Sequence, residues 1–293
     1  MLETRDLTIR FGGHVAVDHV SCAFAPGTLT AIVGPNGAGK TTYFNLISGQ
    51  LPASEGQVLL DGHDITTLPA PLRTRRGLGR AFQLTQLFPN LTVRENVRLA
   101  IQAREAGRGQ GGGWGGVDLF RVWLDRQTWI DEAQAILAQV RLANQADAHA
   151  SALPHGDQRK LEVAMLIALD PKVFMFDEPT AGMSLDEVPV ILDLIRMLKA
   201  RRNSTILLVE HKMDVVRELA DRIIVLHNGQ LVADGEPAAV IASPVVQQAY
   251  LGMAAEDEPG LATVPTDGLA TVPADGREPG ESERLASREV GAA

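Results

Sequence analysis

Short, uninterrupted apolar runs alternate along the chain with amphipathic stretches of helical period. The clearest apolar runs cover residues 29–33, 173–176 and 205–209. Runs of this length in which apolar residues predominate are typical of strands that are buried on both faces of a parallel sheet. Amphipathic stretches lie between them, for example at residues 187–201 and 214–219. This alternation predicts βαβ units and an α/β fold.

Two stretches break this pattern. Residues 108–116 contain six glycines in nine positions, which predicts a flexible loop between helices rather than a continuous helix. Residues 260–267 are followed by a near copy of themselves at 268–275, in a tail rich in proline, glycine and acids. This composition favours disorder. We therefore expect one α/β body over residues 1–253 and a disordered acidic tail over residues 254–293.

Composition narrows the class of protein. The chain has 293 residues, of which 45% are hydrophobic and 22% charged, as in ordinary globular proteins. Its single cysteine, Cys22, excludes an internal disulfide and any CxxC metal site, and we expect it to be a small buried residue. No apolar run approaches the roughly 20 residues that cross a bilayer. The first residues lack the pattern of a secretory signal, so the expected location is the cytosol.

The charge of the chain argues against one class of partner. The net charge is −9, of which −6 lies in residues 254–293. Proteins that bind duplex nucleic acid usually present a strongly basic surface to its phosphates. The acidic balance of this chain therefore predicts no nucleic-acid partner.

A complete phosphate-binding motif follows the first buried run. It matches G-x-x-x-x-G-K-[ST] at Gly34-Pro35-Asn36-Gly37-Ala38-Gly39-Lys40-Thr41, with Thr42 directly after it. The glycines let several backbone N–H groups converge on phosphate oxygens, and the following helix directs its positive end at the same place. Lys40 supplies a charge for the β- and γ-phosphates, and the Thr41 hydroxyl can bind Mg²⁺. The motif predicts that the chain binds a nucleoside triphosphate.

Acidic residues end the second buried run. Asp177 and Glu178 follow residues 173–176, at the sheet edge where ligands of α/β proteins bind. Asp177 is placed to hold Mg²⁺, and Glu178 is placed to activate the attacking water as a general base. His211 comes just after the third run, and it could bind a γ-phosphate oxygen and orient the water. These residues predict hydrolysis of the bound nucleotide.

Taken together, the motifs resemble the ATP-binding subunits of ABC transporters. The resemblance covers about residues 3–253 and rests on motifs in the order and spacing of that family. They are the phosphate loop 34–41, Arg80-Ala81-Phe82-Gln83, Leu153-Pro154-His155-Gly156-Asp157-Gln158, the acidic pair 177–178 and His211. The resemblance implies a P-loop NTPase fold of the ABC ATPase type. Such a fold has a mainly parallel core sheet, an antiparallel β subdomain and a helical subdomain at about residues 84–165.

The same resemblance implies roles for single residues. Phe11 is similar to the aromatic residue that stacks on adenine, and Gln83 to the glutamine that reaches Mg²⁺ and the attacking water. His211 is similar to the switch histidine. Gly156 lies in the signature segment, which in this family binds the ATP held by an opposing subunit. Residues 84–96 would contact the transmembrane partner. ATP and Mg²⁺ are the implied ligands.

Three positions depart from the family pattern. Pro154 replaces the usual signature serine and removes two donors, Asp157 adds a negative charge, and Ser184 stands where aspartate is typical. These changes predict a dimer with unequal ATP sites. A heterodimer with a second ATPase subunit is the main expectation, and a homodimer is the alternative.

Within the family, the sequence resembles the branched-chain amino acid and urea import group. The supporting segments are Phe11-Gly12-Gly13, residues 82–83 with 87–97, residues 177–183, and residues 249–252. The resemblance implies an ATPase on the cytoplasmic side of the plasma membrane. Its partners would be permease subunits, a second ATPase and, indirectly, an extracytoplasmic solute-binding protein. Two alternatives remain open: a soluble ABC-type ATPase, and a nucleotide-dependent regulator with slow turnover.

Overall fold

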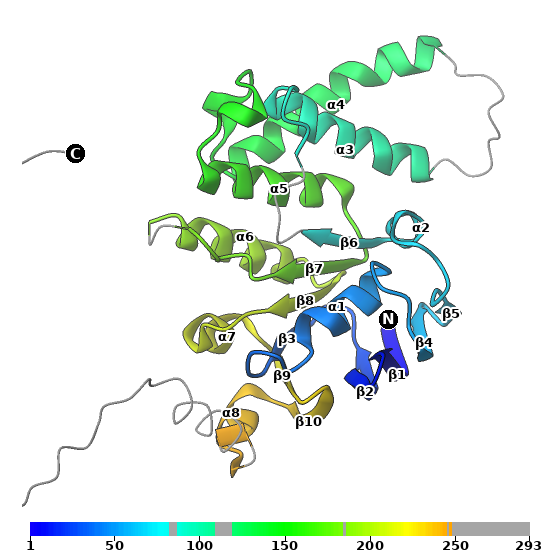
Figure 1. Cartoon of the computed structure of the whole chain (residues 1–293). Coiled ribbons are helices and arrows are strands. Elements are labelled where there is room, and N and C mark those ends of the chain that lie inside the picture. The colour runs from blue at the N-terminus through cyan, green and yellow to red at the C-terminus, as the bar shows by residue number, and fades with distance from the viewer. Residues whose placement is uncertain (82–86, 109–118, 184–185, 245, 248–293) are drawn as a thin grey trace, which may run out of the picture. The chain divides into compact units, whose positions relative to one another are not determined.

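The computed structural model describes residues 1–81, 87–108, 119–183, 186–244 and 246–247 (Figure 1). The strands are β1 (Leu2–Phe11), β2 (His14–Phe24), β3 (Leu29–Val33), β4 (Glu55–Leu60), β5 (His63–Asp64), β6 (Leu78–Ala81), β7 (Val173–Asp177), β8 (Thr205–Val209), β9 (Arg222–His227) and β10 (Gln230–Gly235). The α-helices are α1 (Lys40–Ser48), α2 (Ala70–Arg75), α3 (Val93–Arg108), α4 (Leu119–Gln139), α5 (His155–Leu169), α6 (Val188–Ala200), α7 (Met213–Leu219) and α8 (Pro237–Ile241). Two short 3₁₀ helices lie at Ala143–Gln145 and Ala150–Ala152.

A six-stranded sheet forms the centre of the described chain. Its strand order is β10-β9-β3-β8-β7-β6, and all neighbours pair in parallel except β10, which runs antiparallel to β9 at one edge. Every residue of β3, β7 and β8 is buried. This explains their continuous apolar sequences, because side chains of both alternating sets enter a core.

The two faces of this sheet contribute to different cores. On β7, Phe174 and Phe176 pack with apolar residues of α3, α4, α5 and α6. The alternate residues, Val173 and Met175, pack with α1 and with the second sheet. The strand thus separates a helical core from a core that contains the helix following the phosphate loop.

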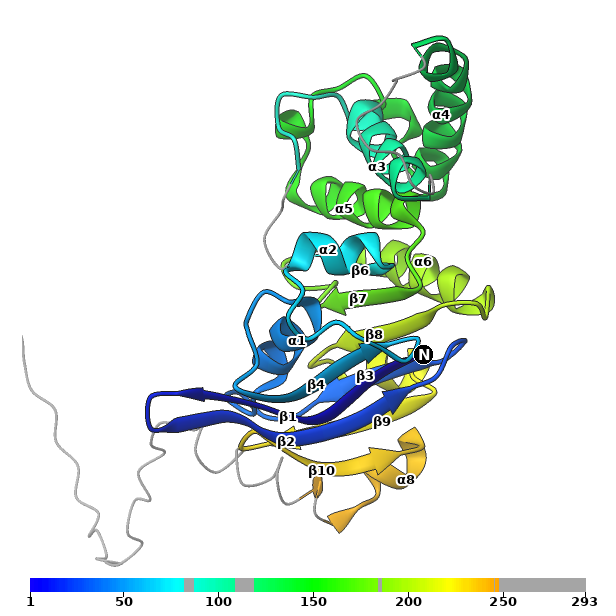
Figure 2. The same cartoon turned by 90° about the vertical axis from the view of Figure 1, so that its right-hand side faces the viewer.

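The second sheet has four strands in the order β2-β1-β4-β5, all antiparallel (Figure 2). Buried residues of β1 and β2 share a core with α1. Cys22 is part of this core and is 6% exposed, which confirms that it is a small buried residue. Helices α3, α4 and α5 lie together beyond the β6 and β7 edge of the central sheet (Figure 1).

The predicted fold class is confirmed: the central sheet is mainly parallel, the second sheet is antiparallel, and α3, α4 and α5 form a group of helices. The strands predicted at 29–33 and 205–209 have those bounds, and the strand predicted at 173–176 extends to Asp177. The helices predicted at 187–201 and 214–219 are α6 and α7, each within one residue at either end. The loop and tail predictions for 108–116 and 254–293 fall almost wholly outside the described residues. Among the described residues, no helix combines the length and apolar character that crossing a bilayer would need.

Candidate nucleotide-hydrolysis site

The phosphate-binding motif forms the connection from β3 to α1. Lys40 is the first residue of α1, and its Nζ donates to the carbonyl oxygens of Gly34 and Pro35, both at 2.7 Å. The lysine side chain therefore bonds back to the loop that precedes it. Burial lowers the pKa of Lys40, and the nearby charges of Glu178 and Asp177 oppose that shift.

Glycine is required at Gly39 for two reasons. Its φ is +93°, in the left-handed region that side chains other than glycine rarely adopt. A Cβ atom at this position would also lie 2.4 Å from the carbonyl oxygen of Ala16 on β2. Gly37 has a φ of +77° but would meet no atom within 4 Å. Of these two glycines, only Gly39 lies directly against β2.

Asp177 is the last residue of β7, and its side chain is fully buried. Its Oδ2 accepts a hydrogen bond from Arg80 Nη2 at 2.7 Å. Its Oδ1 has no partner among the described residues. Burial raises the pKa of Asp177, and the Arg80 guanidinium opposes that shift. One carboxylate oxygen is therefore buried without a partner among the described residues, and Asp177 does not itself line the cavity described below.

Glu178 follows in a strained backbone conformation, with a φ of +48°. Its N–H donates to the carbonyl oxygen of Val209 at 2.9 Å, which fixes the turn to the end of β8. The Glu178 Oε1 atom lies 2.7 Å from His211 Nε2. Because a carboxylate accepts, we place the hydrogen of this bond on the histidine ring.

The turn that carries His211 is held by a buried acid. Glu210 is 3% exposed, and its Oε2 accepts from the backbone N–H of His211 at 2.8 Å. Its Oε1 accepts from the Thr180 hydroxyl at 2.5 Å. The two loops that present Glu178 and His211 are therefore tied together at their bases. Sequence reasoning gave Glu210 no role, because an acid beside a histidine has no distinctive spacing.

One cavity of about 350 Å³ brings most of the predicted residues together. It is lined by His14, Ala16, Asn36, Gly37, Ala38, Gly39, Lys40, Thr41, Thr42, Glu178 and His211. Residues as far apart in the chain as His14 and His211 thus face one space. His14 was assigned no role from the sequence, and the only signal for it is its closeness to Phe11 across the turn between β1 and β2.

Phe11 lies at the end of β1, paired with His14 of β2, and it is 50% exposed. It does not line the cavity itself. Gly34 and Pro35 are likewise absent from the lining, and their carbonyl oxygens accept from Lys40. An exposed ring beside the cavity remains consistent with stacking on a base, which stays a prediction.

The signature segment lies at the start of α5. Gly156 is the second residue of that helix, and a Cβ atom there would lie 1.8 Å from the Glu187 carboxylate. Gly156 does not line the cavity of its own chain. Asp157 accepts hydrogen bonds from Lys160 at 2.7 Å and from Gln145 at 2.8 Å. Burial raises the pKa of Asp157, but these partners outweigh it, so the pKa is lowered. The extra charge is therefore balanced within the chain.

Two predicted residues cannot be placed. Gln83 and Ser184 lie outside the described residues.

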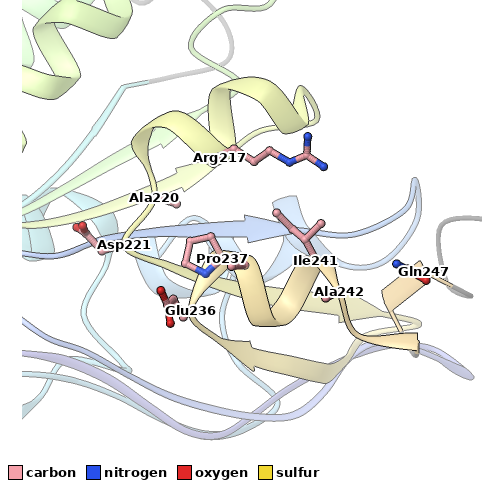
Figure 3. Close-up of a pocket in the computed structure, with 9 residues that line it drawn as sticks. Arg217, Ala220, Asp221, Glu236, Pro237, Ile241, Ala242 and Gln247 are labelled. Atoms are coloured by element: carbon pink, nitrogen blue, oxygen red, sulfur yellow. The ribbon is translucent and has the colours of Figure 1, made fainter.

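A larger hollow, of about 660 Å³, lies between α7 and α8 (Figure 3). It is lined by Arg217, Ala220, Asp221, Glu236, Pro237, Ala238, Ile241, Ala242 and Gln247, none of which belongs to a predicted motif. Among the described residues, no group of three or more histidine, cysteine or acidic side chains could hold a metal by itself.

Comparisons with known proteins identify related sequences and structures. The family model described as "ABC transporter" matches residues 17–181. The chain is 37% identical over 254 residues to the high-affinity branched-chain amino acid transport ATP-binding protein LivG of Escherichia coli K12, covering 87% of this chain and 98% of LivG. It is equally similar, with the same coverage, to the corresponding protein BraF of Pseudomonas aeruginosa. A crystal structure of an ATP-binding cassette of an ABC transporter in its ADP conformation superposes with a TM-score of 0.70. That structure is 31% identical and covers 86% of this chain and 98% of its own.

Proposed function

Because this chain belongs to the ABC transporter family, as one of its ATP-binding cassettes, we propose that it is the ATP-hydrolysing subunit of a solute importer. It is an ABC ATPase by family, and the proposal concerns its residues, partners and solute. The observation that supports it best is the shared cavity. Lys40, Thr41, Glu178 and His211 come from three separate loops and line the same space.

In the proposed reaction, ATP and water give ADP and phosphate. The triphosphate enters the phosphate loop, and Lys40 exchanges its bonds to Gly34 and Pro35 for phosphate oxygens. The water oxygen attacks the γ-phosphorus, the bond to the bridging oxygen breaks, and Glu178 accepts the proton from the water. His211 donates its Nε2 hydrogen bond to Glu178 in this structure, and we propose that it donates the same bond to a γ-phosphate oxygen once ATP is bound and so orients the water.

The residues present fit a magnesium ion. Asp177 offers a buried oxygen that lacks a partner among the described residues, and the Thr41 hydroxyl lines the cavity. Oxygen ligands of this kind suit Mg²⁺. Gln83 is the third proposed ligand. When bound, the ion neutralises charge on the β- and γ-phosphates. Phe11, at the edge of the cavity, is proposed to stack on the adenine.

We further propose that two such subunits enclose ATP between them. The start of α5 at Gly156 would face the ATP of the partner subunit, with a helix N-terminus directed at the phosphate. Asp157 does not oppose this, because Lys160 and Gln145 already pair with it. Pro154 still lacks the donors of serine, so unequal sites in a heterodimer remain the proposal. A Pro154→Ser variant that leaves the ATPase rate unchanged would show that this substitution is neutral.

The relatives' names support the proposed solute class. LivG and BraF are named as ATP-binding proteins of high-affinity branched-chain amino acid transport. The proposed solutes are branched-chain amino acids or related small polar molecules such as amides and urea. The chain would lie on the cytoplasmic side of the membrane, bound to permease subunits and served by a solute-binding protein. Residues 1–253 would form the ATPase domain, with a helical subdomain at about 84–165.

The test separates catalysis from coupling. Glu178→Gln keeps the shape of the site but removes the base, so we expect ATP binding to persist and turnover to fall by at least about a hundredfold. Unchanged turnover would refute the assigned role. Tagged chain recovered from its native membranes should carry permease subunits with it. Recovery without them would favour a soluble ABC-type ATPase, and slow turnover of the permease-bound form would favour a regulator.

A further inference from the structure

Arg80 is a buried arginine next to the proposed metal ligand. It lies on β6, the edge strand that pairs with β7, and its side chain is 6% exposed. Its guanidinium group donates a hydrogen bond to the side chain of Asp177. The phosphate-loop motif and the acidic pair did not require an arginine here, and the sequence gave Arg80 no role.

The guanidinium group is fixed from the other side by α1 and by Gln50, which follows that helix. Arg80 Nη1 donates to Asn45 Oδ1 at 2.6 Å, to Ser48 Oγ at 2.9 Å and to Gln50 Oε1 at 3.0 Å. Its central carbon also lies 5.2 Å from the centre of the Phe44 ring. Because α1 begins at the phosphate loop, Arg80 connects the far end of that helix to Asp177.

This arrangement leaves the two oxygens of Asp177 in different states. Oδ2 is held by Arg80 Nη2 at 2.7 Å, whereas Oδ1 is buried and has no partner among the described residues. A planar guanidinium with several fixed donors can hold a carboxylate in one orientation. A buried polar atom without a partner is costly and points to a ligand that the atom receives in another state.

We propose that Arg80 is a positioning residue, which holds Asp177 by Oδ2 so that Oδ1 is presented to the Mg²⁺ of the bound nucleotide. This inference rests on the proposed function, because it needs the chain to bind Mg²⁺ with ATP. Partners that orient metal ligands typically change metal affinity by 10- to 100-fold when removed. Arg80 itself touches neither nucleotide nor metal in this assignment.

The test compares nucleotide binding with and without the metal. A fluorescent ATP analogue is titrated into the full chain in EDTA and then in Mg²⁺, and Mn²⁺ binding in the presence of ATP is followed by electron paramagnetic resonance. For Arg80→Met we expect metal-dependent affinities to fall about tenfold. The affinity in EDTA should stay within about twofold, because the loop and Lys40 are unchanged.

Arg104→Met is the matched control. Arg104 is also a mostly buried arginine, with a side chain 13% exposed that pairs with Glu132 at 2.7 Å, but it lies on α3, away from the cavity. It should leave both affinities unchanged. Arg80→Lys keeps the charge, but a lysine cannot reach Asp177 and the acceptors on α1 at the same time. Its affinity for the ATP analogue should therefore fall about threefold in Mg²⁺ and stay unchanged in EDTA.

Two results would overturn the proposal. One is wild-type metal dependence in Arg80→Met, and the other is an equal loss in EDTA and in Mg²⁺, which would indicate a structural role alone. If Arg80→Met does not fold, the same criteria apply to Arg80→Lys. Failure of the wild-type chain to bind ATP with Mg²⁺ would instead refute the proposed function, so the two failures can be told apart.

Discussion

Replacing Gly39 with alanine tests why the phosphate loop has its shape. Two effects act at this position: a φ of +93° and the approach of the Ala16 carbonyl oxygen to 2.4 Å from an added Cβ. Gly37→Ala has the first effect without the second, since its φ is +77° and no atom lies within 4 Å of its Cβ. The pair therefore separates backbone strain from steric contact.

The expected magnitudes follow from these two terms. Placing alanine in the left-handed region costs about 1 kcal/mol, and this is the whole expected loss for Gly37→Ala. Gly39→Ala must also push β2 away, because Cβ and a carbonyl oxygen do not approach closer than about 3 Å, and such overpacking costs about 2 kcal/mol more. Ala16 cannot yield easily, since the next segment of β2 is held by the bond from Asp18 N–H to the Gly229 oxygen at 2.9 Å. We expect a total loss of about 3 kcal/mol.

Urea unfolding followed by circular dichroism measures both variants. It is carried out without nucleotide, so that altered ligand binding does not enter the free energy of unfolding. Gly62→Ala is a control outside the loop, with a φ of +77° and no atom within 4 Å, and it should resemble Gly37→Ala. Equal stability of Gly39→Ala and Gly37→Ala would refute the argument, because contact with β2 would then contribute nothing.

Three further predictions concern other parts of the chain. Arg73 is 2% exposed and donates to the carbonyl oxygens of Leu46 and Ile47 at the end of α1, both at 2.7 Å. Arg73→Met should therefore lower the free energy of unfolding, measured by urea titration, by about 3 kcal/mol. A loss below about 1 kcal/mol would contradict this prediction. His211→Ala should reduce kcat about a hundredfold with little change in ATP affinity, as measured by phosphate release and nucleotide titration, and a raised Kd with normal kcat argues against the assigned role. Hydrogen bonds from Lys172 and the N-terminal amine lower the pKa of Asp61 to about 2. The ionised carboxylate therefore stabilises the fold above about pH 4, and this contribution is lost as the pH falls toward 2. Between pH 6 and pH 2 the wild type should lose slightly more stability than Asp61→Asn, by at most about 1 kcal/mol because the ion pairs are exposed. Identical pH profiles of the two proteins would be inconsistent with this pairing.

Local sequence was sufficient for the phosphate loop and for the strands beside it. The glycines, Lys40 and Thr41 lie within eight residues, so their spacing alone predicts the loop and the helix that starts at Lys40. Asp177 and Glu178 could equally be predicted from the sequence, because they follow a buried apolar run. Asp157 shows the limit of this reasoning. Its negative charge was expected to disfavour a phosphate site, whereas in the structure Lys160 and Gln145 donate hydrogen bonds to its carboxylate.

Arg80, Glu210 and His14 were beyond the reach of sequence patterns. Arg80 lies 97 positions from Asp177, and it reaches that residue only because β6 and β7 are neighbours in the sheet. Glu210 gains its role from Thr180, which is 30 positions away on another loop. No periodicity encodes such contacts, since they depend on which strands pair.

The chain's own order of residues thus determined what each local segment can do: curl around phosphate, end a strand in acids, or start a helix. Strand pairing and packing decided which of those segments face one another, and hence that His211 meets Glu178 and that Asp177 keeps one oxygen unused. The physical reason is that the two kinds of interaction act over different separations along the chain. Backbone conformation and helix dipoles act over a few residues, whereas the hydrophobic cores on the two faces of the sheet fix the distances between distant loops.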